Sequence, residues 1–155
     1  MKRPGVSSLL AMEILTTRLH PDAVIPLYAN DGDAGCDLVA VESCTLRARG
    51  GRALVATGLA VAIPEGHGGF VLPRSGLASR HGVTCANAPG LIDPGYRGEV
   101  KVALVNLDPE NDYEIHKGDR IAQLVVIALE RSEFSLVDEL PPATRGEGGF
   151  GSTGR

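Results

Sequence analysis

Short apolar runs separated by turn-forming residues constrain the fold of this chain more than any other feature of its sequence. Runs rich in Val, Leu and Ile recur at spacings of about ten residues between Gly, Pro, Asn and Asp, which is typical of an all-β sandwich or barrel. One short helix is predicted over Gly76–His81, with Ser75 as its cap and Gly82 at its end. The predicted strands include Leu54–Ile63, Phe70–Leu72, Val100–Leu107 and Ile121–Leu129.

The predicted strands show two kinds of apolar pattern. In Val100–Leu107, the apolar residues Val100, Val102 and Leu104 alternate with Lys101 and Ala103, which predicts one buried face. The runs 54–63 and 121–129 are apolar on both faces. Strands that must be buried on both sides in so small a domain indicate a partner subunit.

The composition excludes several classes of protein. The chain has 155 residues, enough for one domain with its own core, and a formal net charge of −4. This charge argues against a protein that binds nucleic-acid backbones, and no segment approaches the roughly 20 apolar residues of a membrane span. We therefore expect no nucleic-acid partner and no membrane partner. Three cysteines without a C-x-x-C pair favour a reducing compartment, so a cytoplasmic protein is predicted.

The two ends of the chain differ from its middle. Residues 1–11 are predicted to be an extension outside the core, and residues 12–140 to form the β domain. The tail, residues 141–155, consists mostly of Gly, Ser, Thr and Ala, with Phe150 as its one large apolar residue. Such a tail cannot build a core of its own, so it is predicted to be a mobile arm.

The segment Gly90–Val100 contains the best candidate for a general base. It places Asp93 before a Pro94-Gly95 turn, interpreted as a rigid hairpin directly before an apolar strand, where a carboxylate can hold a proton acceptor still. An aspartate before Pro-Gly is more often only a turn former. The motif by itself leaves both interpretations open.

Two further segments are candidates for binding anions. One candidate is the start of the predicted helix beside Gly76, where Arg74, the Ser75 hydroxyl and the free helix amides converge. In the alternative interpretation, Ser75 only caps the helix and Arg74 is a solvated charge. The tail half matches a Walker phosphate loop but lacks its lysine, so that interpretation is rejected. Its glycine amides and Arg145 instead suit an anion-binding concavity, and Phe150 suits stacking on a base; a tail without function is the alternative.

Residues that bind metals are sparse. The four histidines are scattered and none has zinc spacing, and the acidic stretch Asp31–Asp37 lacks the bidentate glutamate of a calcium loop, so it is interpreted as a structural turn. Magnesium remains open, because this ion commonly keeps its waters and binds through substrate phosphates.

Five segments, in this order and at these distances, closely resemble the five motifs of the trimeric deoxyuridine triphosphatase (dUTPase) family. The resemblance covers residues 13–154, and five motifs in register are far more specific than any one of them. The segments are Asp33–Leu38, Pro73–Ala78, Asn87–Glu99, Arg120–Leu124 and Arg145–Gly154.

The resemblance implies a homotrimer of jelly-roll-like β-barrel subunits, each with one short helix, whose shared active sites are closed by the arm of another subunit. It implies hydrolysis of dUTP to dUMP and pyrophosphate, which supplies dUMP for thymidylate synthesis and keeps uracil out of DNA. Asp93 resembles the base that activates water for attack on the α-phosphorus, and Asp37 the residue that orients water on Mg2+. The other implied roles are phosphate binding by Arg74, Ser75, Gly76 and Gln123, uracil recognition by Asn87, Leu91 and Ile92 with Lys101 nearby, deoxyribose packing by Tyr96, and closure by Arg145, Phe150, Gly151 and Ser152.

Two rival functions share the same fold. In the dCTP deaminases, a catalytic glutamate falls near the position of Ala103, and alanine cannot transfer the proton that deamination needs. A non-catalytic nucleotide sensor is expected to lose Asp93 or the tail, and this chain has both.

Overall fold

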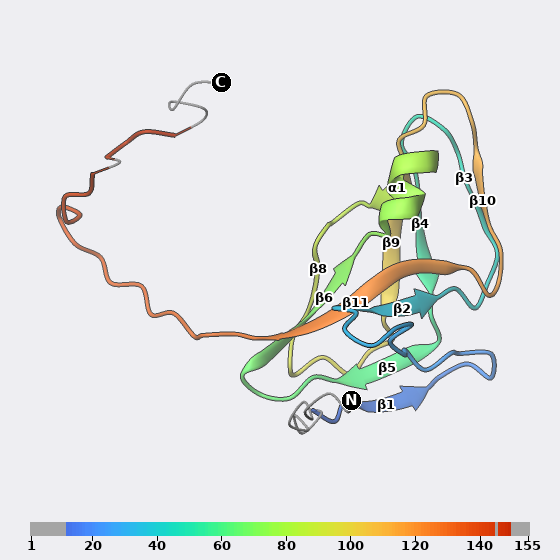
Figure 1. Ribbon diagram of the computed structural model, residues 1–155, viewed down its shortest axis with the longest axis horizontal. Helices are drawn as coiled ribbons and strands as arrows, with labels where there is room; N and C mark the ends of the chain where they lie inside the picture. The colour runs from blue at the N-terminus through green and yellow to red at the C-terminus, as the bar shows by residue number, and fades with distance from the viewer. Residues whose placement is uncertain (1–11, 145, 150–155) are drawn as a thin grey trace, which may run out of the picture.

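The computed structural model describes residues 12–144 and 146–149. Within them every regular element except one short helix is a β-strand, as predicted (Figure 1). The elements are β1 (Leu15–Arg18), β2 (Cys36–Val39), β3 (Cys44–Leu46), β4 (Gly51–Ala56), β5 (Leu59–Ala62), β6 (His67–Leu72), α1 (Ser75–His81), β7 (Val83–Cys85), β8 (Gly90–Ile92), β9 (Lys101–Asn106), β10 (Tyr113–Ile115) and β11 (Arg120–Ala128).

The strands form two larger sheets and two strand pairs, and all the pairings are antiparallel. The four-stranded sheet has the order β2-β11-β6-β8, and the three-stranded sheet has the order β4-β9-β7. The two smaller pairs are β1-β5 and β3-β10. No helix in the described part of the chain is long and apolar enough to cross a membrane.

One apolar core joins the two larger sheets. It contains Leu38 of β2, Val55 of β4, Leu104 of β9 and Leu124 of β11, each nearly inaccessible to solvent. The alternation predicted for β9 is confirmed, because its even positions are buried and Lys101 is exposed. Each fully buried Leu or Val stabilises the fold by about 1.5 to 3 kcal/mol relative to an exposed one.

The single strand predicted over residues 54–63 is wrong, because two strands, β4 and β5, occupy this range. They are separated by Thr57 and by Gly58, whose φ of 66° is accessible to glycine at little cost. The buried Thr57 hydroxyl donates a hydrogen bond to the carbonyl of Val100 at 2.5 Å. Hydropathy alone does not detect such a break, since both residues sit inside a continuous apolar run.

The apolar run predicted as the strand 121–129 corresponds to β11, and the strand predicted at 70–72 is the end of the longer β6. The prediction that this strand is buried on both faces is correct only for the first half of β11. Ile121 and Leu124 are buried, whereas Ile127 is 43% exposed. The second half of this strand therefore presents apolar surface in a single chain.

The helix α1 differs from its prediction at its first turn only. Ser75 is the first helical residue and Arg74 is the N-cap, with no side-chain hydrogen bond capping the helix, so the predicted Ser75 cap is wrong. The end is as predicted, because Gly82 adopts the left-handed conformation and its amide donates to the carbonyl of Ala78 at 3.1 Å.

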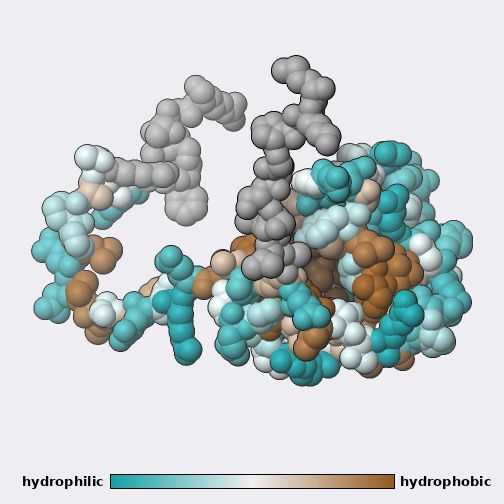
Figure 2. Space-filling model, turned by 60° about the horizontal axis from the view of Figure 1, so that its bottom comes forward, coloured by the Kyte–Doolittle hydropathy of each residue, from teal (hydrophilic) through white to brown (hydrophobic). Residues whose placement is uncertain are grey.

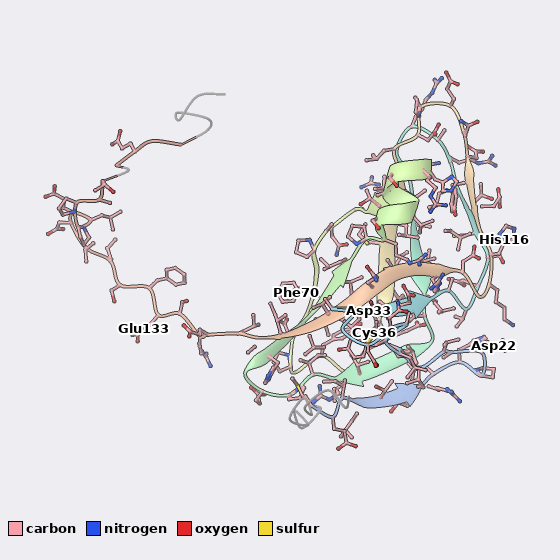
Figure 3. All side chains as sticks on the ribbon, viewed as in Figure 1. Asp22, Asp33, Cys36, Phe70, His116 and Glu133 are labelled. Atoms are coloured by element: carbon pink, nitrogen blue, oxygen red, sulfur yellow. The ribbon has the colours of Figure 1, made fainter. Side chains whose placement is uncertain are left out.

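After β11 the chain leaves the barrel and runs outward as an extended segment, residues 129–144 (Figure 1). Its apolar side chains Phe134 and Leu136 are 95% and 102% exposed. Figure 2 shows apolar patches along this segment and on the face of the barrel turned to the viewer, and Figure 3 shows Glu133 away from the barrel. The predicted domain boundary at residue 140 falls inside this segment, and residues 1–11 lie outside the described residues.

Candidate active site

A cleft of about 560 Å³ opens where the chain passes from β8 to β9. It contains every described residue predicted to contact the base or the sugar, together with Asp93, so the structure brings these side chains together. The lining residues are Leu54, Val71, Asn87, Gly90, Leu91, Ile92, Asp93, Tyr96, Glu99, Val100, Lys101 and Ala103. We refer to this region as the Asp93 cleft.

The hairpin predicted for this segment is wrong. Strand β8 pairs with β6, whereas β9 pairs with β4 and β7, so the residues between them form a corner that crosses from one sheet to the other. The predicted turn is present, because the amide of Tyr96 donates to the carbonyl of Asp93 at 3.1 Å. Strand β9 begins only at Lys101. The pairing of a strand depends on distant neighbours, which local turn signals do not specify.

The Asp93 carboxylate is exposed in the cleft, and no other residue in the described part of the chain binds it. Within the described residues, no hydrogen bond or ion pair engages its oxygens, in contrast to Glu99 of the same cleft, which accepts a hydrogen bond from the amide of Gly58 and pairs with Lys101. A free carboxylate on a fixed corner can accept a proton from a bound water molecule.

The Tyr96 side chain is fixed at the edge of the cleft. Its hydroxyl donates to the carbonyl of Glu99 at 2.9 Å. A Cβ atom at Gly98 would lie 2.5 Å from the Tyr96 hydroxyl oxygen, so only glycine leaves room for the ring in this position. Gly98 is thus part of the site, a role that the sequence did not reveal.

A second group of predicted residues forms what we call the Asp37 cluster. One Asp37 oxygen accepts a hydrogen bond from Nε of Arg74 and the other accepts one from Nη1 of Arg120, each at 3.0 Å. The Asp37 side chain is 15% exposed, and Arg74 also donates to the carbonyl of Arg120 at 3.2 Å. Gln123 lies opposite Asp37 across β2 and β11, which places it beside this cluster.

Strand pairing explains why these distant residues meet. Strand β11 lies between β2 and β6, with Gln123 opposite both Asp37 and Leu72, and Arg74 follows β6 by two residues. Ser75 and Gly76 continue from Arg74 into α1. The role of Arg120 was not predicted from the sequence, although its position at the start of the motif Arg120–Leu124 was the available signal.

The Asp37 cluster and the Asp93 cleft are separate in one chain. A smaller cleft of about 260 Å³ contains Arg74, Tyr113 and Arg120, and it shares no lining residue with the Asp93 cleft. The predicted phosphate-binding residues and the predicted base are therefore not united within one chain. The predicted tail residues Arg145, Phe150, Gly151 and Ser152 lie outside the described residues.

The described residues contain no group of three or more His, Cys, Asp or Glu side chains that could hold a metal ion directly. Both oxygens of Asp37 already accept hydrogen bonds from guanidinium groups. This arrangement fits the predicted role for Asp37, which is to orient a metal-bound water rather than to ligate the ion. The acidic stretch before it is a structural turn as predicted, since Asp33 accepts a hydrogen bond from the amide of Asn30 at 2.8 Å.

All three cysteines are free thiols, and burial raises the pKa of each of them. A raised pKa disfavours the reactive thiolate, so none of them is a candidate nucleophile. Cys36 adjoins Asp37 and, with Asp33, lies where the chain enters β2 (Figure 3).

Comparisons with known proteins agree on one family. A family model described as dUTPase matches residues 22–154. The deoxyuridine 5'-triphosphate nucleotidohydrolase of Thermobifida fusca is 57% identical over 137 residues, which cover 88% of this chain and 76% of that protein. The structure of the Staphylococcus bacteriophage 80alpha dUTPase with dUPNHPP matches with a TM-score of 0.85 and 30% identity, over 94% of this chain and all of that one. A mutant dUTPase from phage phi11 of S. aureus, which coordinates a structural Mg(II) ion, matches with a TM-score of 0.76 and 26% identity, over 84% of this chain and 100% of that one.

This chain belongs to the dUTPase family. The resemblance found in its five motifs is thereby confirmed, and so is the predicted all-β fold with a short helix.

Proposed function

We propose that this protein is a dUTP nucleotidohydrolase, which hydrolyses dUTP to dUMP and pyrophosphate. Family membership and curated relatives of that activity support the reaction. The observation that carries the proposal is the Asp93 cleft, where a free carboxylate shares one cavity with the residues proposed to bind base and sugar. The reaction supplies dUMP for thymidylate synthesis and keeps uracil out of DNA.

In the proposed mechanism, Asp93 accepts a proton from a water molecule as that water attacks the α-phosphorus in line with the leaving pyrophosphate. Asp93 suits this role because its carboxylate is exposed to the cleft and unpaired, whereas Glu99 is already engaged. Proton transfer to a positioned base typically accelerates a reaction by about 10² to 10⁴-fold.

The proposed base site uses backbone groups of Leu91 and Ile92 with the side chain of Asn87, all in the Asp93 cleft, and Lys101 nearby. Backbone groups that form hydrogen bonds with the edge of uracil cannot form them with cytosine, because the donors and acceptors of cytosine are reversed. Bound cytosine would leave these groups unpaired. Each unpaired buried polar group costs about 1 to 3 kcal/mol. Tyr96 packs against the deoxyribose and leaves no room for a 2′-hydroxyl group.

The phosphates are proposed to bind Arg74, Ser75, Gly76 and Gln123, with Arg145 from the tail. Positive groups and fixed amides counter the negative charge that develops as the phosphorus–oxygen bond breaks. Asp37 would orient a water of a Mg2+ ion bound through the triphosphate, and such an ion would supply further neutralising charge. The tail closes the site, with Phe150 stacked on the base and Gly151 and Ser152 against the phosphates.

A homotrimer with shared active sites follows from the same proposal. The Asp93 cleft and the Asp37 cluster are separate within one chain, so a site that uses both needs residues from two subunits. The apolar surface of β11 near Ile127 and the exposed Phe134 and Leu136 of the extended segment support contacts with further copies.

The rival functions are less well supported. Ala103 lines the Asp93 cleft at the position where a deaminase needs its glutamate. A nucleotide sensor that does not catalyse a reaction needs no proton acceptor at Asp93. The unpaired Asp93 carboxylate therefore favours an enzyme over a sensor.

The proposed function is tested by offering dUTP, dCTP, dTTP and UTP separately with magnesium and identifying every product. We expect dUMP and pyrophosphate from dUTP and no turnover of the other three nucleotides. Release of ammonia from dCTP would establish the deaminase instead. Tight binding of dUTP without any product would establish the sensor.

A further inference from the structure

Glu99, a residue to which neither the sequence nor the comparisons assign a role, connects the corner that carries Asp93 to the barrel. We infer that Glu99 is a positioning residue, which fixes the Asp93 corner through the turn between β4 and β5. This inference rests on the proposed dUTP hydrolysis and concerns the geometry of its base.

Three contacts of Glu99 place it at the centre of the cleft wall. Its Oε1 accepts a hydrogen bond from the amide of Gly58 at 2.8 Å, and its Oε2 lies 3.4 Å from Nζ of Lys101. Its backbone carbonyl accepts the hydroxyl of Tyr96 at 2.9 Å. The side chain is 24% exposed. Glu99 therefore contacts two residues of the proposed substrate site and one residue of a distant turn.

The corner needs such an attachment because its residues form no regular strand pairing that would hold them in place. Strand β8 ends at Ile92 and β9 begins at Lys101, and the two strands belong to different sheets. The residues between them pair with neither strand in a regular ladder. Their conformation is therefore set by individual contacts with the rest of the barrel.

The turn between β4 and β5 supplies these contacts. The Thr57 hydroxyl donates to the carbonyl of Val100 at 2.5 Å, and the amide of Val100 donates to the carbonyl of Leu59 at 2.7 Å. Both contacts hold the backbone at the far end of the corner. The Glu99 side chain makes the third contact, with the amide of Gly58. Of the residues that make these three contacts, Glu99 is the one that also binds Tyr96, through its backbone carbonyl.

The hydrogen bond to Gly58 matters more than the ion pair with Lys101. The Lys101 side chain is 43% exposed, and ion pairs exposed to solvent contribute little to stability. A bond from a backbone amide to a carboxylate is charge-assisted and fixes geometry. Removing the bond frees the corner, and a displacement of about 1 Å at a reacting group costs about 10²-fold in rate.

The experiment compares Glu99→Ala and Glu99→Gln with the wild-type protein. We expect Glu99→Ala to lower kcat for dUTP about 10- to 100-fold with KM changed less than about threefold. Glu99→Gln keeps an oxygen that can accept from Gly58 while losing the ion pair, so it is expected to recover most of kcat. Melting temperatures confirm that each variant is folded.

Glu114→Ala is the matched control. Glu114 lies on β10, outside both clefts, and its carboxylate also joins two strands by accepting the Thr45 hydroxyl at 2.8 Å. We expect this variant to lower the melting temperature only slightly, because the lost hydrogen bond is exposed, and to leave kcat unchanged. A reduced kcat in Glu99→Ala beside a normal kcat in Glu114→Ala separates positioning from general stability.

Three results would overturn the inference while leaving dUTP hydrolysis intact: a normal kcat in folded Glu99→Ala, a raised KM with unchanged kcat, or no recovery in Glu99→Gln. A wild-type protein that releases no pyrophosphate from dUTP would instead refute the proposed function, and this inference with it.

Discussion

The Asp93 cleft and the Asp37 cluster differ in how their carboxylates are paired. In the cleft, the Asp93 carboxylate has no partner among the described residues and faces solvent. In the cluster, both oxygens of the mostly buried Asp37 accept hydrogen bonds from arginine side chains. A free carboxylate is available for proton transfer, whereas a paired one orients the groups around it. The chain thus keeps its proposed base and its proposed phosphate-binding group in separate environments.

The two regions also differ in how much of the proposed site one chain brings together. One chain supplies every described residue proposed for the base and the sugar, and it supplies them in one cavity. The arginine side chains lie in another cleft, and the extended segment 129–144 runs away from the barrel (Figure 1). The described residues proposed to recognise the nucleoside therefore belong to one chain, and phosphate binding is proposed to be a property of the assembly.

The largest expected effect tests the free carboxylate. Asp93→Asn keeps the shape of the side chain but removes its basicity, so we expect kcat to fall about 10² to 10⁴-fold while dUTP binding, measured by calorimetry, is retained. Asp31→Asn, at an exposed turn position with no assigned role, serves as the control. Hydrolysis by Asp93→Asn at the wild-type rate would exclude Asp93 as the base.

The next effect tests the tail. Deletion of residues 145–155 is expected to lower activity about 10²-fold, because closure orders the phosphates and excludes water. The assembly itself should persist in sedimentation experiments. If the deletion dissociates the protein, the tail holds the subunits together rather than closing the site.

A mixing experiment tests whether the two regions act across subunits. Asp93→Asn and Arg74→Ala are each expected to be nearly inactive alone. Co-expressed in equal amounts, they should restore activity in about a quarter of the sites, because random assembly pairs an intact Asp93 with an intact Arg74 at that frequency. If both residues of a site come from one subunit, no mixed trimer gains activity.

A stability measurement tests the support of the Asp93 corner. Thr57→Val replaces a buried hydroxyl and leaves the Val100 carbonyl without its partner, so we expect the free energy of unfolding to fall by about 1 to 3 kcal/mol. Urea denaturation provides the value. Thr45→Val, at an exposed position, is the control and should change stability by less than about 0.5 kcal/mol.

The smallest effect concerns a region outside both clefts. The amide of Ala48 and the guanidinium of Arg47 lower the pKa of the exposed Asp112. A lowered pKa in the folded state contributes stability above the ordinary pKa of about 3.9, and this contribution is lost as the pH falls through the lowered value. Asp112→Asn should therefore reduce the melting temperature slightly at pH 7 and not in strong acid. Its dUTP kinetics should match the wild type, and a changed kcat would show coupling to the clefts.

Local sequence signals predicted a large part of this molecule. The alternation around Val102 identified the buried face of β9, Gly82 marked the end of α1, and the Pro94-Gly95 turn was placed correctly after Asp93. These features depend on residues within a few positions of one another. Apart from the Ser75 cap, which is a local error, the predictions failed where a neighbour distant in sequence decides the conformation, as at Gly58, which divides one apolar run into two strands.

The family and the all-β class could be inferred from the sequence, and so could the candidate residues of the site, because five motifs in register and the apolar spacing are properties of the chain alone. Which of those candidate residues lie together is visible only in the folded protein. Antiparallel pairing of β11 with β2 and β6 brings Asp37 to Arg74, and the passage from β8 to β9 between two sheets turns an expected hairpin into a corner held by Glu99. The physical reason is that strand partners are selected by burial of the whole core, so contacts between distant segments are not encoded in any one of them.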